Sequence, residues 1–222
     1  MKYSADLGKL KLEEYQELLK SQNLLPGRKL LQLNLDATFF KIKDAEINNL
    51  DELAKAISAP SKLKAFSKKA EIAEKYLVLL KRELGSLQPK PISLKDFSRI
   101  PVDIIEDLNK TGIKTSKDFY ELFTSSDNSK LLIEAHSLSA DTAYKLFCLC
   151  SLSRINGIGA AAAQCFYDSG YHSIDDVAGG NASEMLNRLN SANDQSKYYK
   201  ASLGTKDTQF CIDYAKMQKL LF

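Results

Sequence analysis

The lysines between residues 55 and 95 are the side chains whose type and spacing point most directly to chemistry. This stretch holds 10 Lys and Arg residues against the acids Glu71, Glu74 and Glu83. Its densest part contains Lys62, Lys64, Lys68 and Lys69. A face with this excess of positive charge predicts contact with phosphate groups. The alternative is a solvated helix surface, since lysine is the usual residue of an exposed position.

The four cysteines do not form a recognisable metal or redox site. One residue separates Cys148 from Cys150, whereas structural zinc sites usually place about two to four residues between ligands. In a helix these two side chains would also point to different faces. Cys165 and Cys211 lie among apolar residues too, so we expect four buried free thiols.

Histidines and carboxylates form no catalytic constellation either. His136 lies near the end of an expected helix and His172 lies in a turn, and their spacing indicates neither a metal site nor a triad. Asp175 and Asp176 are explained by roles in the first turn of a helix. No Walker loop, nucleophile elbow or dinucleotide fingerprint is present. We therefore predict no catalytic residue, no metal site and no cofactor, and we expect that the protein is not an enzyme.

The elements that must position these residues are helices, because apolar residues recur at helical spacing almost throughout the 222-residue chain. Asp127 should cap a helix over about 129–136, and Ser139 should cap one over about 140–153. An amphipathic helix over about 206–221 should pack against the body of the protein. The predicted fold class is therefore all-α, with no substantial sheet.

A polar stretch, residues 190–202, is predicted to be a loose connection. It contains Tyr198, Tyr199 and Lys200, the aromatic and basic cluster that we most expect to be exposed. This cluster could stack on a base or contact a protein. The alternative is that the tyrosines pack within the linker.

Two prolines, Pro89 and Pro91, exclude a continuous helix at this point of the chain. We therefore predict an N-terminal helical domain with a basic face over 1–88 and a C-terminal helical domain over 92–222. No apolar run reaches the ~18–20 residues of a membrane span, and the start of the chain lacks the apolar core of a signal peptide. Few cysteines argue against a disulfide scaffold, so we expect a reduced, cytoplasmic and soluble protein.

A nine-residue pattern occurs three times without gaps, over 45–53, 111–119 and 169–177. Gly112 and Gly170 stand where a left-handed residue would close the last turn of a helix. The next residue in each copy is apolar and should pack back on that helix. Each copy therefore predicts a helix, a tight turn and a short second helix.

The second half of the pattern predicts how each short helix begins. The N-cap candidates are Asn49, Thr115 and Ser173, and the acids three residues later are Glu52, Asp118 and Asp176. This spacing resembles a capping box, in which each side chain bonds the backbone of the other residue. Glu46 replaces glycine in the first copy, so we expect that turn to differ.

Residues 155–163 resemble a helix-hairpin-helix motif, in which an apolar residue, a glycine, an apolar residue and a second glycine open the second helix. In that motif the free N–H groups of the second helix hold a DNA phosphate. The resemblance implies contacts at Gly157, Ile158, Gly159 and Ala160, with the Ile158 side chain anchoring the turn in the core.

The hairpin departs from the DNA-binding pattern in its charge. Four alanines follow the second glycine, where many DNA-binding hairpins carry Lys or Arg. Residues 141–190 hold Lys145, Arg154 and Arg188 against five acids. The alternative is therefore that residues 160–163 allow close helix packing and that the hairpin binds no phosphate.

More broadly, the chain resembles an uncharacterised bacterial family known as domain of unknown function 4332. The matching stretches are residues 24–29, residues 76–83, and residues 152–155 with the glycine pair after them. The resemblance implies tandem helix-hairpin-helix-like units over nearly the whole chain, and it implies no established activity.

These observations favour a non-catalytic nucleic-acid-binding module, sequence-nonspecific because neither the hairpin amides nor the lysine face reads base edges. Its partner would be DNA or another nucleic acid. The alternative is a protein-interaction scaffold of helical hairpins without nucleic-acid binding. An enzyme with a dispersed site would need a deep pocket with converging titratable groups. The sequence implies neither a membrane nor a small-molecule substrate.

Overall fold

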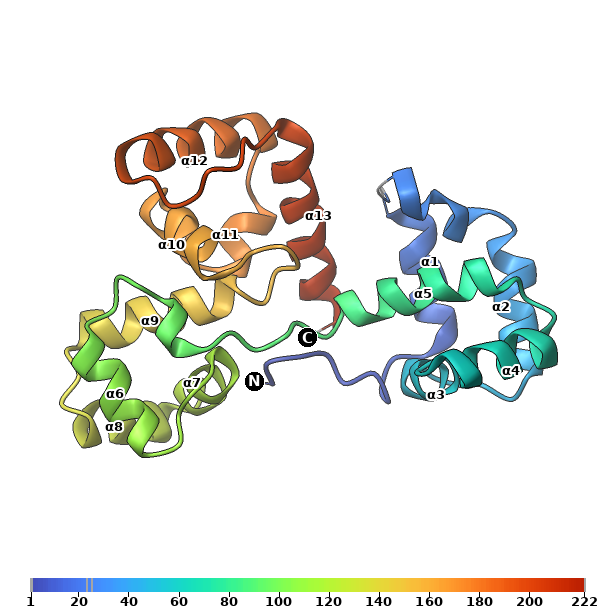
Figure 1. The fold of residues 1–222 in the computed structure, drawn as a ribbon, viewed down its shortest axis with the longest axis horizontal. Helices are drawn as coiled ribbons and strands as arrows, with labels where there is room; N and C mark the ends of the chain where they lie inside the picture. The colour runs from blue at the N-terminus through green and yellow to red at the C-terminus, as the bar shows by residue number, and fades with distance from the viewer. Residues whose placement is uncertain (1, 23, 25, 222) are drawn as a thin grey trace. The chain divides into compact units, whose positions relative to one another are not determined.

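The computed structural model describes residues 2–22, 24 and 26–221, and the side chains of all of these except Ser126 and Leu220. The described residues form helices and turns and no strand, which confirms the predicted all-α class (Figure 1). The chain divides into two compact units, Ala5–Gln88 and Pro89–Leu220. Residues 2–4 belong to the second unit and not to the N-terminal domain predicted over 1–88.

The first unit contains five α-helices and one 3₁₀-helix among its described residues. They are α1 (Leu12–Ser21), η1 (Pro26–Gln32), α2 (Leu35–Asp44), α3 (Leu50–Ala56), α4 (Pro60–Ala70) and α5 (Glu74–Ser86). Each helix turns a stripe of Leu, Ile, Phe or Tyr inward, as helical spacing of apolar residues requires. The hydroxyl of Tyr76 donates a hydrogen bond to the carbonyl of Leu31 at 2.9 Å. Burial raises the pKa of Tyr76 to about 12.

The second unit begins with a short 3₁₀-helix and continues with eight α-helices. They are η2 (Leu94–Asp96), α6 (Val102–Lys110), α7 (Ser116–Phe123), α8 (Ser126–Ala135), α9 (Ala140–Leu152), α10 (Ala160–Asp168), α11 (Ile174–Ala178), α12 (Ala182–Ser196) and α13 (Thr205–Leu221). Helix α9 is the central element, because it packs against both α7 and α10. Most of its second half is buried, including Cys148 and Cys150.

A buried arginine ties distant parts of this unit together. Arg154 follows α9 and is only 4% exposed. Its Nε donates to the carbonyl of Tyr3 at 2.9 Å, and its Nη1 donates to the hydroxyl of Tyr120 at 2.6 Å. Gln218 of α13 donates to the carbonyl of Arg154 at 2.7 Å. These bonds explain why residues 2–4 pack with the second unit.

The three copies of the nine-residue pattern form turns of the same handedness. The second residue of each copy has a positive φ: 67° at Glu46, 93° at Gly112 and 88° at Gly170. Because Glu46 replaces glycine, the sequence predicts that the first turn differs from the other two. That prediction is wrong for the handedness of the turn, which is the same in all three copies. Glu46 adopts the left-handed conformation despite its Cβ, at a strain of about 1–2 kcal/mol relative to an ordinary backbone conformation.

Each short helix after these turns begins with the expected cap. The side chains of Asn49, Thr115 and Ser173 accept the N–H of the residue three positions later at 3.0, 3.3 and 3.1 Å. The acid at that position accepts in return from the turn backbone, and the Asp118 carboxylate bonds the N–H groups of Lys114 and Thr115. The predicted reciprocal capping is confirmed at Thr115 and Ser173.

Other helix boundaries correct the sequence-based prediction. Ser139 caps α9 by accepting the N–H of Thr142 at 3.1 Å, as predicted. Helix α8 instead begins at Ser126 with Ser125 as its N-cap residue, so Asp127 lies in the first turn and is not the cap. The prediction of a loose stretch from residue 190 is also wrong in part, because α12 continues to Ser196.

Candidate functional site

The glycine pair lies in the turn between α9 and α10. The N–H of Ile158 bonds the carbonyl of Ile155 at 3.0 Å, and Gly157 has a φ of 93°. Both Gly157 and Gly159 are exposed, and a Cβ added to either would meet nothing within 4 Å. Ile158 is only 4% exposed and anchors the turn, as the sequence suggested. The turn therefore presents glycine backbone to open space while its apolar side chain is buried.

Helix α10 begins without a cap from any described side chain. Gly159 is its N-cap residue, and its first turn contains no acidic residue. The first intrahelical bond runs from the N–H of Ala163 to the carbonyl of Gly159 at 2.8 Å. The N–H groups of residues 160–162 precede that bond, so they are the donors that a helix leaves without an internal partner. Ala163 is fully buried and lets α10 pack closely, whereas Ala161 is exposed.

A cavity of about 490 Å³ lies beside this helix start. The hairpin forms one wall with residues 156–162, and the opposite wall comes from α12, the segment after it, and α13. The apolar side chains of that opposite wall are Leu189, Leu203 and Phe210. No local pattern indicated this cavity, because its walls run from Asn156 to Cys211 along the chain.

The titratable side chains of the cavity are held in their protonated forms or already bonded. Burial raises the pKa of the Cys211 thiol to about 12, and burial raises the pKa of Tyr199 as well. The Asp207 carboxylate accepts the N–H of Gly204 at 2.8 Å. Thr208 donates to the carbonyl of Ala182 at 2.8 Å. Among the described residues that line the cavity, this arrangement supplies no activated nucleophile.

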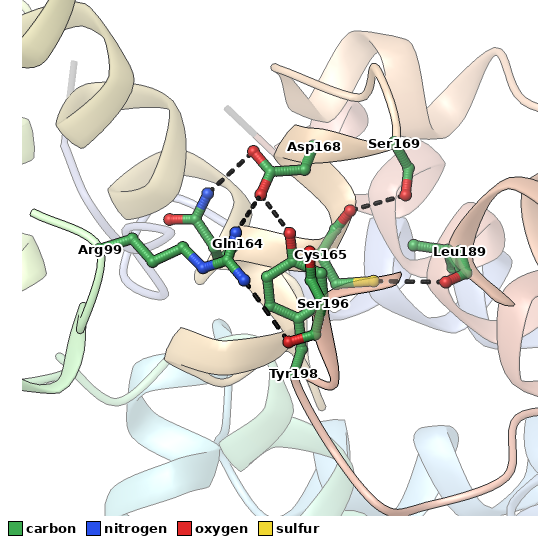
Figure 2. A network of polar contacts seen from close by, with 8 residues as sticks. All are labelled: Arg99, Gln164, Cys165, Asp168, Ser169, Leu189, Ser196 and Tyr198. Carbon is green, nitrogen blue, oxygen red and sulfur yellow. Dashed lines mark hydrogen bonds and ion pairs between the residues drawn. The ribbon is translucent and has the colours of Figure 1, made fainter. Parts of the chain in front are cut away.

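A polar network holds the segment after α12 against α10 (Figure 2). The Asp168 carboxylate accepts from Gln164 at 3.0 Å, pairs with Arg99 at 3.4 Å and accepts from the hydroxyl of Tyr198. The Arg99 guanidinium also lies 4.4 Å from the centroid of the Tyr198 ring. Arg99 donates further to the carbonyl of Ser196. Sequence reasoning missed this network, because Arg99 and Asp168 show no local pattern.

The two tyrosines that we singled out therefore have internal partners. Tyr198 belongs to the network of Arg99 and Asp168, and Tyr199 lines the cavity with its hydroxyl 3.6 Å from the Cys165 sulfur. The side-chain amide of Asn193 in α12 bonds the backbone of Tyr199 twice: its Nδ2 donates to the Tyr199 carbonyl and its Oδ1 accepts the Tyr199 N–H, each at 3.1 Å. These contacts favour the packed alternative over an exposed stacking platform.

The four candidate lysines lie on α4 of the first unit, and the structure leaves all four exposed. Leu63, Phe66 and Ala70 form the buried stripe of that helix, so the lysines occupy its remaining faces. Lys69 is engaged locally, because its Nζ donates to the carbonyl of Ala45 at 3.0 Å and lies 3.3 Å from the Glu46 carboxylate.

The other three lysines of α4 differ from Lys69. Within the described part of the chain, Lys62, Lys64 and Lys68 make no hydrogen bond or ion pair. The lysine face and the hairpin belong to different units, so the structure does not bring the two predicted sites together within one unit.

The residues considered for metal or acid–base chemistry have structural roles. His136 lies at the end of α8, where its Nδ1 is 2.6 Å from the Asp107 carboxylate. The His172 ring packs on Tyr167 with centroids 4.4 Å apart. All four cysteines are free thiols, and Cys211 is only partly buried. The described residues contain no cluster of His, Cys, Asp or Glu suited to a metal ion.

The geometry defines an all-α protein of short helices joined by tight turns, with one uncapped hairpin beside a cavity. A family model described as a domain of unknown function (DUF4332) matches residues 100–218, and the chain belongs to that family. The match lies within the second unit and excludes residues 24–29 and 76–83, on which the wider resemblance partly rested. No curated protein and no solved structure matches the chain. None of the described helices has the length and apolar character needed to cross a membrane.

Proposed function

We propose that this protein is a non-catalytic, sequence-nonspecific nucleic-acid-binding protein of the cytoplasm. The observation that carries the proposal is the unpaired charge of Lys62, Lys64 and Lys68 on the exposed faces of α4. Neutralising phosphates with such side chains releases counterions, and this release supplies most of the affinity in nonspecific binding.

Other lysines of the first unit differ from these three because they have acidic neighbours. Five of them lie within ion-pair distance of a carboxylate: Lys20, Lys41, Lys43, Lys55 and Lys69. A lysine that already has an acidic neighbour offers less net charge to a phosphate. The outer faces of α4 therefore carry three positive charges that no acid offsets among the described residues, close together on one helix.

The hairpin is the second, weaker contributor in this proposal. Its support is the uncapped start of α10 together with the open space at Gly157 and Gly159. Its limitation is charge, because the first turn of α10 contains neither Lys nor Arg. Backbone donors without nearby cations add less affinity than lysines do.

The proposal includes three tandem helix-hairpin-helix-like units, α2–α5, α6–α9 and α10–α13. Two left-handed residues support each unit. In the order of the three units, the left-handed residues between the first and second helices are Glu46, Gly112 and Gly170. The left-handed residues after the third helix are Glu71, Ser137 and Lys197. The two tandem units that lie in the second compact unit pack on each other through α9 and α10.

Fluorescence anisotropy with labelled single- and double-stranded DNA at about 50 and 200 mM salt tests the proposal. We expect binding that weakens steeply with salt. In the variant Lys64→Glu with Lys68→Glu, we expect weaker binding to every sequence and a salt slope lower by about two, one for each lost phosphate contact. We avoid Lys69 in this variant because its side chain bonds Ala45 and Glu46.

A matched control is Lys117→Glu with Lys130→Glu, which makes the same change in net charge in the second unit. Both lysines are exposed and, among the described residues, have no bonded partner. We expect the control to retain most of the affinity and nearly the wild-type salt slope. Absence of binding by the wild type at low salt, or equal losses in both variants, would contradict the assignment to α4.

A protein-interaction scaffold is the second candidate function. The observation that favours it is the exposure of large apolar side chains in the first unit, with Phe40 of α2 71% exposed and Leu33 62% exposed. Absence of DNA binding in the anisotropy experiment would make this candidate the preferred one, with Phe40→Ser as the first variant for pull-down measurements.

A further inference from the structure

The cavity beside α10 has the dimensions and the chemistry of a ligand site. Its volume of about 490 Å³ lies within the roughly 300–1,000 Å³ of small-molecule pockets. Its inner end is formed by buried residues, among them Ile158, Phe166 and Leu189. Exposed lining residues, including Ala161 and Ala201, mark where it opens to solvent.

The walls of the cavity are largely apolar. Phe166, Leu203 and Phe210 supply apolar surface, and the hydroxyl of Thr208 is already bonded to the carbonyl of Ala182. Water in a cavity is stable only with about two to four polar partners, and an apolar cavity of about 150 Å³ is already large enough to bind benzene. The apolar part of these walls therefore favours an apolar occupant over water.

Two lining side chains narrow the class of ligand. Asp207 is the charged side chain of the lining, and its carboxylate opposes the attraction of the free α10 N–H groups for an anionic ligand. Asn156 also lines the cavity, and in the described part of the chain its side-chain amide has no hydrogen-bond partner. This amide is available for one polar contact.

We propose that this cavity binds an uncharged, mainly aromatic or alicyclic small molecule that carries one hydrogen-bonding group. Its rings pack between Ile158 and Phe166 on one side and Leu203 and Phe210 on the other. Its polar group bonds the amide of Asn156. This site is separate from the lysine face, shares the hairpin residues with the weaker nucleic-acid contact, and goes beyond the proposed binding of nucleic acid.

Titration of the full chain with N-phenyl-1-naphthylamine, an uncharged aromatic amine whose fluorescence rises in apolar surroundings, tests the site. We expect saturable binding to a single class of site. The variant Ala161→Phe places a ring at the opening of the cavity and should weaken binding about tenfold or more. Absence of saturable binding, or equal affinity in this variant when it is folded, would overturn the proposal.

Matched variants and a matched probe sharpen this experiment. Ala65→Phe adds the same ring to an exposed position of α4 in the first unit, which supplies no residue to the cavity, and this variant should bind the probe like the wild type. Ala201→Phe narrows the opening from the opposite wall and serves if Ala161→Phe fails to fold, as judged by its circular dichroism.

An anionic probe of the same rings, 8-anilino-1-naphthalenesulfonate, tests the uncharged class of the ligand. It should bind about tenfold or more weakly than the amine, because of Asp207. Equal or tighter binding of the sulfonate would overturn that assignment. The Lys64→Glu and Lys68→Glu variant should bind the amine like the wild type, so failure of the nucleic-acid proposal and failure of this one are distinguishable.

Discussion

The turns at Gly112 and Gly157 share a left-handed glycine and a buried isoleucine, but the helices that follow them begin differently. Both glycines have a φ of 93°, and in both turns the following isoleucine is buried. After Gly112, the side chain of Thr115 and the carboxylate of Asp118 occupy the N–H groups at the start of α7. After Gly157, no side chain caps the start of α10.

The difference separates what a tight turn needs for folding from what it leaves available for binding. A left-handed residue and an apolar anchor are enough to reverse the chain in both places. A capping box adds stability by satisfying donors internally, which also withdraws them from any ligand. The uncapped hairpin gives up that stability and keeps its donors accessible.

The largest expected effect concerns the anchor that the two turns share. Ile113→Ala and Ile158→Ala should each lower the free energy of unfolding by about 2–4 kcal/mol, because both side chains are buried. Urea unfolding followed by far-UV circular dichroism measures this loss. A much smaller loss for Ile158 would break the comparison, since it would mean that the hairpin is not anchored as the repeat turn is.

An effect of intermediate size is expected from removing one cap. Asp118→Ala should lower the free energy of unfolding by about 1 kcal/mol, because the Asp118 carboxylate accepts from the backbone of Lys114 and Thr115. The control Asp103→Ala removes an exposed acid from the first turn of α6, which has no side-chain cap. Asp103→Ala should lower the free energy of unfolding by less than about half of the loss expected for Asp118→Ala. Equal losses would assign the effect to the helix dipole and not to the cap.

The smallest stability effect, and the sharpest test of the hairpin, is expected from adding a cap. Gly159 has a φ of −82°, so Asp or Asn fits there without strain. Gly159→Asp and Gly159→Asn should each raise the free energy of unfolding by a few tenths of a kcal/mol.

DNA affinity in the anisotropy experiment distinguishes the two substitutions at Gly159. Both occupy the α10 donors, but only Asp adds a negative charge that repels phosphate, so Asp should weaken binding more than Asn. If both variants bind DNA with the affinity of the wild type, the hairpin is not part of the proposed nucleic-acid interface. The interface would then consist of α4 alone.

The turn pattern was readable from the sequence because it depends on neighbouring residues. Gly112, Thr115 and Asp118 act within one short segment, and so do Gly170, Ser173 and Asp176. Glu46 was the exception. Its contacts with Lys69 bring together α4 and the turn after α2, and they are made only in the folded unit.

The engaged and unengaged lysines of α4 could not be separated by sequence. Lys68 and Lys69 are neighbours of the same type, and a local pattern treats them alike. Folding places the Lys69 side chain against the carbonyl of Ala45, whereas Lys68, about 100° further round the helix, remains unpaired. Which acceptor a lysine contacts at a distant position of the sequence depends on how the helices pack.

The sequence by itself determined the all-α class, the left-handed glycine turns and most of their caps, because helical spacing, glycine conformation and capping act over a few residues. Only the tertiary structure decided that Arg154 is buried against Tyr3 and Tyr120, and that Tyr198 and Tyr199 are held by internal partners. The cavity beside α10 also depends on tertiary structure, since its walls come from α10, α12 and α13. Burial and concavity arise from contacts between distant segments, and local residue preferences do not encode them.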